Sequence, residues 1–437
     1  MSENIDINVE YVTRVEGHGN IVVNATDGTI ETCEWQVIEA PRYFESMVVG
    51  RKWDVLHHIT SRICGICSIG HTLASLKATE HAMGIEVSEQ DVLLRKLALH
   101  GENMQSHILH VGYLALPDLL GVGSVLPLAS SHPDELKTVI RVHRLANDLS
   151  AAIGGRTTHP QRLIPGGFSK LPSEEELRRL RERLEASVDD LYAIAGLVQD
   201  AAGRLPDFER ETEFISLTHD DEYALYDGDI MSSDTGTAAV EDYLDITNEY
   251  VVPQSTAKYA RHARESYMVG ALARLNNNYD MLGPMAKGVA EMFDLKPMNF
   301  NPYMNTVAQL VEVVDSVEES VGIIDSLLER GLSPQPAYHQ PDITPKSGRG
   351  IGAVEVPRGV LFHDYTYDED GVCTGANCVI PTNQNHANIQ RDMEELVPRI
   401  LDKPEDDIEL TLEMLVRAYD PCISCSTHYL DVSFVDA

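Results

Sequence analysis

Two pairs of cysteines near opposite ends of the 437-residue chain constrain its fold more than any other feature. The first pair, Cys64 and Cys67, lies in the segment SRICGICSIGH. The second pair, Cys422 and Cys425, lies in YDPCISCSTH. Four thiolates form a soft ligand set that suits zinc, iron or nickel. If the four share one metal centre, the chain must fold so that its beginning meets its end.

The spacing of these cysteines alone leaves more than one kind of site open. Structural zinc sites also use four cysteines, but their two pairs are usually about 15–20 residues apart. A thioredoxin-like dithiol needs a single C-x-x-C motif in a βαβ unit. The total of seven cysteines is odd and does not indicate a disulfide framework. Metal or redox chemistry is therefore the first expectation, with structural zinc as the alternative.

The charge balance is strongly acidic, with 69 Asp and Glu residues against 34 Lys and Arg residues and a net charge of −35. Such a surface repels nucleic acid and anionic lipid, so neither is expected as a partner. No stretch approaches the roughly 20 apolar residues of a membrane span. The N-terminal sequence MSENIDINVEYV has no basic start followed by an apolar run, so we do not interpret it as a signal peptide.

Hydrophobic periodicity predicts strands at the N-terminus and helices through most of the middle. Residues 5–40 alternate apolar and polar side chains on both sides of Asp27-Gly28, a hairpin signal. Beyond about residue 53 the spacing becomes helical up to Pro117, and Ser173 is a typical N-cap for a long amphipathic helix. Further predicted elements are a hairpin at 214–230, helices at 238–275, 305–332 and about 405–417, and loops with short strands at 333–383.

These elements predict a mainly α fold with peripheral β strands, an α+β protein. The sequence has no internal repeat and no low-complexity linker, so we expect a single catalytic domain over residues 1–437. Within it, residues 1–50 are expected to be β-rich and residues 53–332 mainly helical. Residues 333–428 are expected to form a loop and strand region that ends in the second cysteine motif.

Several separated motifs follow one another along the chain: RVEGHG (14–19), RICGIC (62–67) with His71, GGRTTHPQRLIPGG (154–167), VEVPRGVLFHDY (354–365), VIPTNQN (379–385) and DPCISCSTH (420–428). In this order they resemble the motifs of nickel–iron hydrogenase large subunits. A C-x-x-C motif is common by chance, whereas both pairs with these flanks are highly specific. The resemblance implies a central helical bundle with an N-terminal antiparallel sheet, and the cleavage or formation of H2.

The resemblance also implies a role for each cysteine. Cys64 and Cys422 correspond to terminal thiolates on nickel. Cys67 and Cys425 correspond to thiolates that bridge nickel to an iron carrying cyanide and carbon monoxide. Heterolysis of H2 needs a Lewis acid and a base held close together, and Cys422 is the implied first proton acceptor. Glu16 in RVEGHG matches the family's proton-relay glutamate; without the motif it would be taken for a surface or capping acid.

Arg358 in VPRGV matches the arginine whose guanidinium lies over the metal pair, where its fixed donors suit a cyanide ligand. Without the motif it would be taken for a loop arginine with a carboxylate partner. Pro381 and Thr382 fall where the family binds the other cyanide. These three residues therefore form the implied surroundings of the iron ligands.

A second metal site is implied near the C-terminus. Glu45 and His428 match its ligands, together with a backbone carbonyl that we assign to Cys378. In the family this site holds magnesium or iron, and carboxylate, carbonyl and water oxygens suit such a hard cation. The residues alone leave His428 equally open as an ordinary tail residue, while His107, His110 and His363 are expected in the core.

The chain has no further cysteine cluster with the spacing of iron–sulfur ligands. Iron–sulfur clusters are therefore expected only in a partner, an iron–sulfur small subunit, with further electron-transfer subunits behind it. Ser106 stands where many membrane-linked members carry an aspartate, which favours the cytoplasmic, cofactor-coupled group. Residues 429–437 resemble the tail that a C-terminal protease removes during maturation, a process that also implies a maturation chaperone.

Other functions remain open from the sequence. One is a non-catalytic relative such as the quinone-binding subunit of the respiratory complex, although that homologue has lost the cysteines. Another is an H2-sensing homologue with low turnover. The third is a structural subunit whose four cysteines bind a zinc ion. Retention of all four cysteines argues against the quinone-binding relative.

Overall fold

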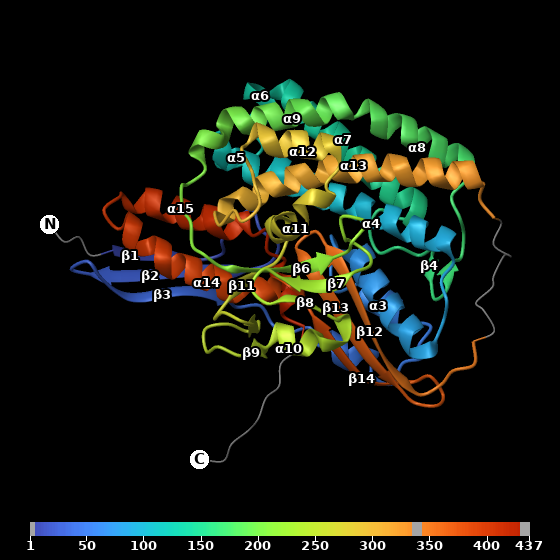
Figure 1. The fold of residues 1–437 in the computed structure, drawn as a ribbon. Coiled ribbons are helices and arrows are strands. Elements are labelled where there is room, and N and C mark those ends of the chain that lie inside the picture. Colours follow the sequence, from blue (N-terminus) through green and yellow to red (C-terminus); the bar gives the residue numbers. More distant parts are fainter. Residues whose placement is uncertain (1–4, 334–342, 429–437) are drawn as a thin grey trace, which may run out of the picture.

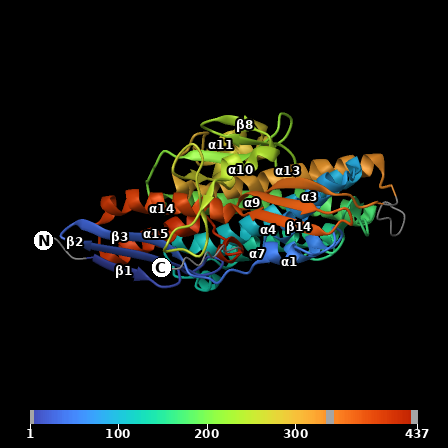
Figure 2. The same ribbon diagram turned by 90° about the horizontal axis from the view of Figure 1, so that it is seen from below.

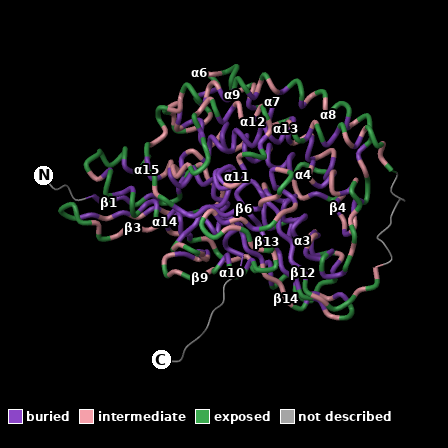
Figure 3. The backbone as a smooth tube through the Cα atoms, in the orientation of Figure 1, coloured by how far each residue is buried: buried purple, intermediate pink, exposed green. Residues whose placement is uncertain are grey.

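The computed structural model describes residues 5–333 and 343–428. Several long helices form a layer along one side, and the small sheets lie along the other together with further helices (Figure 1). Buried backbone is concentrated where these parts meet (Figure 3). Within the described ranges, no helix combines the length and hydropathy needed to cross a membrane. The expected tail at 429–437 lies outside the described residues.

The chain opens with the predicted antiparallel sheet, which lies at one end of the molecule (Figure 2). The strands are β1 Ile5–Val9, β2 Gly19–Thr26 and β3 Thr29–Val37. The predicted hairpin is confirmed, since Asp27 and Gly28 join β2 to β3 with φ angles of 51° and 75°, as a two-residue turn requires. Trp35 donates its indole N–H to His386 Nδ1 at 2.9 Å, which fixes the sheet against a C-terminal helix.

The helical layer is built around one long helix. This helix, α13, is buried on nearly all sides along its first half, as expected for an element at the centre of a bundle. It packs against α4, α8 and α12, and α4 also packs against α7. The bounds are α4 Glu89–Leu109, α7 Pro133–Gly154, α8 Glu174–Ala186, α9 Val188–Ala201, α12 Pro284–Met292 and α13 Asn305–Arg330. The prediction for 305–332 is therefore confirmed.

The predicted long helix after Ser173 is interrupted. Ser173 caps α8 as expected, and its side chain accepts the N–H of Glu176 at 3.2 Å in a capping box. The helix ends at Ala186, and α9 begins at Val188. Ser187 Oγ donates to the Leu184 carbonyl at 2.7 Å, a local bond that competes with the helical ladder.

A second sheet supports the first cysteine motif. Its antiparallel strands are β12 Gly348–Val356, β13 Gly359–Tyr367 and β14 Cys373–Val379, in that order. Helix α3, Ser68–Met83, begins directly after Cys67 and lies on β12. Their close approach requires glycine, because a Cβ at Gly352 would lie 2.2 Å from the Ala74 carbonyl oxygen.

The region 238–275 does not form the predicted helices. Pro253 cannot continue a helix, and the preceding valines favour extended backbone. The region instead contains a 3-10 turn at Val240–Asp242, α10 Tyr243–Thr247, β9 Glu249–Tyr250, β10 Tyr259–Ala260 and β11 Tyr267–Met268, and α11 Ala271–Asn278 begins only at its end. The hairpin predicted at 214–230 is confirmed by β6 Glu213–Thr218 and β7 Asp229–Ser232.

The C-terminal region contains more regular structure than predicted. Strands β12 and β13 each span nine residues, where short strands were expected. Helix α14, Pro381–Ile400, was not predicted, whereas α15, Glu405–Ala418, confirms the prediction at 405–417. Buried amide side chains replace apolar ones on part of α14, so its helical periodicity is masked.

The remaining elements are short and connect the layers. They are α1 Phe44–Val48, α2 Leu56–Thr60, a π-helix His110–Ala115, α5 Leu116–Leu119, α6 Leu128–Ser131, α16 Ile423–Ser426, β4 Leu163–Ile164, β5 Gly167–Phe168, β8 Gly236–Ala238, and 3-10 helices at Ala202–Arg204, Tyr279–Met281 and Pro302–Met304.

The close packing of α3 on β12 generates a stability prediction. Replacing Gly352 by Ala places a methyl group against the backbone of α3, and we expect a loss of about 1–3 kcal/mol of unfolding free energy. Gly375→Ala is the matched control in the same sheet, because its Cβ would meet only Thr366 at 3.8 Å. Thermal unfolding of the two purified variants checks this, and equal midpoints would contradict the packing argument.

Candidate metal centre

The two cysteine motifs meet in the interior of the molecule. The first motif forms the loop between α2 and α3, and the second leads into α16. The sulfurs of Cys64 and Cys422 are 3.5 Å apart, and Cys422 and Cys425 are joined by a disulfide. All four cysteines, Cys67 included, are only 2–3 % exposed. The fold therefore satisfies the constraint that the sequence imposes.

Three of the four sulfurs form one compact cluster. The sulfurs of Cys64, Cys422 and Cys425 all lie within 4.8 Å of one another, close enough to bind one metal ion. The Cys67 thiol hydrogen-bonds to Cys64, whose sulfur also accepts the Cys67 backbone N–H at 3.0 Å. The side-chain bond lowers the pKa of Cys64 to about 7 and raises that of Cys67. The thiolate form, which binds metals, is thus favoured at Cys64.

Glu16 joins the N-terminal segment to the second motif. Its backbone carbonyl accepts the N–H of Ile423 at 2.9 Å. Its Oε2 lies 3.2 Å from the Cys422 sulfur and accepts the backbone N–H of Ser424 at 3.1 Å. Gly17, with a φ of 86°, permits this approach, because a Cβ there would lie 2.7 Å from the Ile423 Cβ. Glu16 as a residue is partly exposed, whereas Cys422 beside it is buried.

Arg358 lies in the two-residue turn between β12 and β13 and is 3 % exposed. Its Nε and Nη2 donate to the backbone carbonyl and Oδ1 of Asp420 at 2.5 and 2.8 Å. Its Nη1 donates to Cys67 Sγ at 3.3 Å and to Ser106 Oγ at 3.4 Å. Burial lowers the pKa of Arg358, but the Asp420 carboxylate raises it above its usual value. The guanidinium therefore stays charged beside the sulfurs.

The first turn of α14 holds the second cysteine loop. Pro381 occupies the first helical position, where its missing N–H has no cost. Thr382 Oγ1 accepts the backbone N–H of Cys422 at 3.0 Å. Asn383 donates to the Ser426 carbonyl at 2.9 Å. The two predicted residues of this turn thus lie beside the cysteine cluster.

Glu45 and His428 form a second buried cluster. Glu45 Oε1 contacts His428 Nδ1, but the geometry is not that of a hydrogen bond. Among the described residues, neither Glu45 oxygen nor His428 Nδ1 has a hydrogen-bond partner. A buried carboxylate without a partner is unfavourable, so this donor set fits a cation. Cys378 of β14 is close by: burial raises the pKa of its thiol, and the Glu45 charge raises it further.

Three residues that the sequence did not single out also shape the centre. Arg42 Nη2 donates to the carbonyls of Ile63 at 2.7 Å and of Ser424, and so pins both cysteine loops. The two carboxylate oxygens of Glu102, in α4, accept the N–H groups at positions 69 and 70 at 2.6 and 2.9 Å, where α3 begins. Asp420 orients Arg358. Of the three, only Asp420 could have been found from the sequence, because it is the first residue of the cysteine motif DPCISC.

Comparisons with known proteins agree with this geometry. A family model described as nickel-dependent hydrogenase matches residues 42–138 and 216–428, and one described as HoxL-like matches residues 6–40. The alpha chain of sulfhydrogenase 2 from Pyrococcus furiosus is 33% identical over 97% of this chain and 99% of its own length. The corresponding chain of the F420-non-reducing hydrogenase from Methanothermobacter thermautotrophicus is 32% identical over 98% of this chain and 95% of its own length.

Solved structures show the same fold. A chain from the crystal structure of an NAD+-reducing [NiFe]-hydrogenase in the H2-reduced state superposes with a TM-score of 0.86 and 27% identity, covering 97% of this chain and 99% of that one. The α+β fold with a helical bundle and an N-terminal sheet is thereby confirmed as that of hydrogenase large subunits. The chain belongs to the nickel-dependent hydrogenase family, as a large catalytic subunit that activates H2 at a nickel–iron centre.

Proposed function

We propose that the two cysteine motifs hold the nickel–iron centre, with Cys64 and Cys422 as terminal ligands of nickel. Cys67 and Cys425 would be the remaining thiolate ligands of the centre, and the iron would carry cyanide and carbon monoxide. The proposal is supported by the burial of all four sulfurs and by the 3.5 Å separation of Cys64 and Cys422. When bound, such a centre supplies the Lewis acid and the redox metals for heterolytic H2 cleavage.

The proton is proposed to leave from the Cys422 sulfur to the Glu16 carboxylate. The observation that carries this step is the 3.2 Å contact between Cys422 Sγ and Glu16 Oε2, which needs no intervening group. The Ser424 N–H donates to the same oxygen and so orients the carboxyl toward Cys422. Because Glu16 is partly exposed, the proton can pass from it toward solvent.

Three further residues are proposed to surround the diatomic ligands of iron. Arg358 is suited to one cyanide, since its guanidinium is buried, charged and directed at Cys67. Pro381 and Thr382 are proposed at the other cyanide, because the turn that carries them contacts Cys422. The bonds from Arg358 to Asp420 would keep the guanidinium oriented.

Replacing Glu16 by Gln tests the proton route. The amide still accepts the Ser424 N–H but cannot take a proton from Cys422. We expect turnover to fall by about 100-fold or more, because a general acid–base group contributes roughly 10²–10⁴-fold. Turnover is measured as H2-dependent dye reduction by the assembled enzyme, together with its nickel and iron content.

Glu34→Gln is the control for this variant. Glu34 lies in β3 and accepts a hydrogen bond from Gln36, and within the described part of the chain no hydrogen bond or ion pair joins it to Cys64, Cys67, Cys422 or Cys425, so its replacement is expected to leave turnover unchanged. Wild-type turnover in Glu16→Gln with metals bound would refute the route through Glu16. Loss of nickel from that variant would assign Glu16 to the assembly of the centre instead.

Glu45 and His428 are proposed to bind a second cation, magnesium or iron, with the backbone carbonyl of Cys378. The support is the pair of buried Glu45 oxygens that lack a donor within the described part of the chain. The packing of α1 against β14 brings Glu45 and Cys378 to the same place. A cation there would tie the C-terminal His428 to the second sheet.

Glu45→Gln is expected to release this cation. An amide has no charge to balance a divalent ion, so elemental analysis should show less magnesium, or less iron relative to nickel, than in the wild type. Asp54→Asn, on the same segment and partly exposed, is the control and should retain the metal. Equal magnesium and iron in both variants would rule out Glu45 as a ligand.

We also propose that the partner which takes the electrons is an iron–sulfur small subunit. The remaining cysteines, Cys33, Cys373 and Cys378, lack the spacing of cluster ligands. The segment just before the first cysteine loop exposes large apolar side chains, a feature that suits a docking face. These are Tyr43, Met47, Val49 and Val55, which are 45, 46, 44 and 39 % exposed.

Further electron-transfer subunits are proposed beyond the small subunit, because relatives are named as subunits of sulfhydrogenases and of an NAD-reducing hydrogenase. The maturation chaperone, the C-terminal protease and the cytoplasmic location stay predictions, as does the division of the single domain into three parts. The structural zinc alternative is disfavoured, because the matching family model is nickel-dependent.

A further inference from the structure

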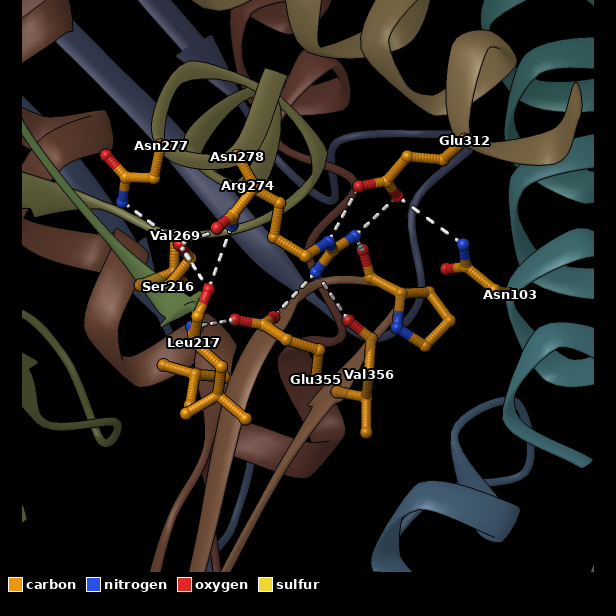
Figure 4. Close-up of polar contacts among 12 residues, drawn as sticks. Asn103, Ser216, Leu217, Val269, Arg274, Asn277, Asn278, Glu312, Glu355 and Val356 are labelled. Carbon is orange, nitrogen blue, oxygen red and sulfur yellow. Dashed lines mark hydrogen bonds and ion pairs between the residues drawn. The ribbon is translucent and has the colours of Figure 1, made fainter. Parts of the chain in front are cut away.

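Arg274, an arginine of α11 outside the proposed ligand set, contacts the turn that carries Arg358 (Figure 4). Its side chain is fully buried. Its Nη1 donates to the backbone carbonyl of Val356 at 2.9 Å, and its Nη2 donates to that of Pro357 at 3.0 Å. These carbonyls belong to the two residues directly before Arg358, so the side chain of Arg274 binds the backbone of the turn.

The guanidinium of Arg274 uses all five of its N–H donors. Besides the two carbonyls, Nε and Nη2 donate to the two oxygens of Glu312, each at 2.7 Å. Nη1 donates to Oε2 of Glu355 at 2.8 Å. Arginine presents five donors in a planar fork, whereas lysine has three on one nitrogen. Only arginine can therefore bind both carboxylates and both carbonyls at once.

The two glutamates are themselves fixed by other elements. Glu312 of α13 accepts the Tyr223 hydroxyl at 2.6 Å, and its other oxygen contacts His107 Nε2 at 2.7 Å. Burial raises the pKa of Glu312, but the charge and hydrogen bonds of Arg274 lower it below its usual value, so it stays ionised. Glu355 accepts the Leu217 N–H at 2.7 Å. Arg274, its two glutamates and their hydrogen-bond partners thus connect α4, α11, α13, β6 and β12.

We propose that Arg274 is a positioning residue for Arg358, which sets where its guanidinium lies over the cysteine centre. The turn has only two residues, followed by Gly359 with a φ of 134°, and α11 approaches it closely at Gly270. Arg358 reaches Cys67 and Ser106 through one nitrogen, Nη1, at 3.3 and 3.4 Å, so a displacement of the turn changes both contacts together. The proposal rests on the role proposed above for Arg358.

A second buried arginine supplies a matched control. Arg95 is also fully buried and binds both oxygens of Glu80, at 2.8 and 2.6 Å. It further donates to the Tyr226 hydroxyl and to the Ile164 carbonyl. It has the same chemistry as Arg274 but no contact with the turn at Arg358. A role that is only structural predicts the same outcome for both arginines.

The test compares Arg274→Lys with Arg95→Lys in the assembled enzyme. Lysine cannot hold both carbonyls, so in Arg274→Lys the backbone N–H groups of residue 356 and residues 358–361 should exchange with deuterium at least about tenfold faster. Turnover should fall at least about tenfold with nickel retained, because displacement by about 1 Å can cost about 100-fold. Arg95→Lys should leave both measurements unchanged. Unchanged exchange at 356–361 in Arg274→Lys overturns the proposal.

A double-mutant cycle with Arg358→Lys separates the positioning role of Arg274 from the role proposed for Arg358 itself. If Arg274 acts through Arg358, Arg274→Lys costs little further turnover once Arg358 is replaced, and additive losses overturn the proposal. Full turnover in Arg358→Lys alone would overturn the role of Arg358 itself. If Arg274→Lys does not fold, Glu355→Gln, which keeps an acceptor for Leu217, should give faster exchange at 356–361, and unchanged exchange there overturns the proposal.

Discussion

The contact between the N-terminal segment and the second cysteine motif is the constraint on which the centre depends. Glu16 pairs with Cys422 as an isolated parallel bridge, and Ile423 donates to the Glu16 carbonyl. One hydrogen bond contributes only about 1 kcal/mol. The junction is therefore reinforced by Arg42, which pins both cysteine loops, and by Thr382 at the start of α14. Closing so long a loop is feasible because each doubling of its length costs only about 0.6 kcal/mol.

Buried charge is the second principle of the molecule. Arg358 with Asp420, and Arg274 with Glu312 and Glu355, lie in the interior with nearly every donor matched. Removing one partner of such a pair commonly costs about 3–5 kcal/mol, because the other charge stays buried and unpaired. Because desolvation of the charges offsets most of their attraction, an intact network adds little net stability, and its main effect is to fix the positions of the charged side chains. The network of Arg358 with Asp420 places a charged guanidinium beside the Cys67 sulfur.

The sequence predicted the parts whose signals are local or chemically specific. The hairpin at Asp27-Gly28, the cap at Ser173 and the two cysteine pairs each follow from a few adjacent residues. Helix α14 was missed because buried amides such as Asn388 and Gln390 hydrogen-bond to other elements, which only the tertiary structure reveals. Arg274 and Glu102 were missed for the same reason, since single polar residues in ordinary helices carry no pattern. The helices predicted at 238–275 failed where Pro253 and local strand pairing outweighed apolar spacing.

The measurement that tests the account most directly is infrared spectroscopy of the purified enzyme in the cyanide and carbon monoxide stretching region, with nickel, iron and zinc determined on the same sample. We expect bound nickel and iron, with intense cyanide and carbon monoxide bands that shift on exposure to H2. Zinc in place of nickel, with no bands in this region, would contradict the proposal that Cys64, Cys67, Cys422 and Cys425 hold a nickel–iron centre.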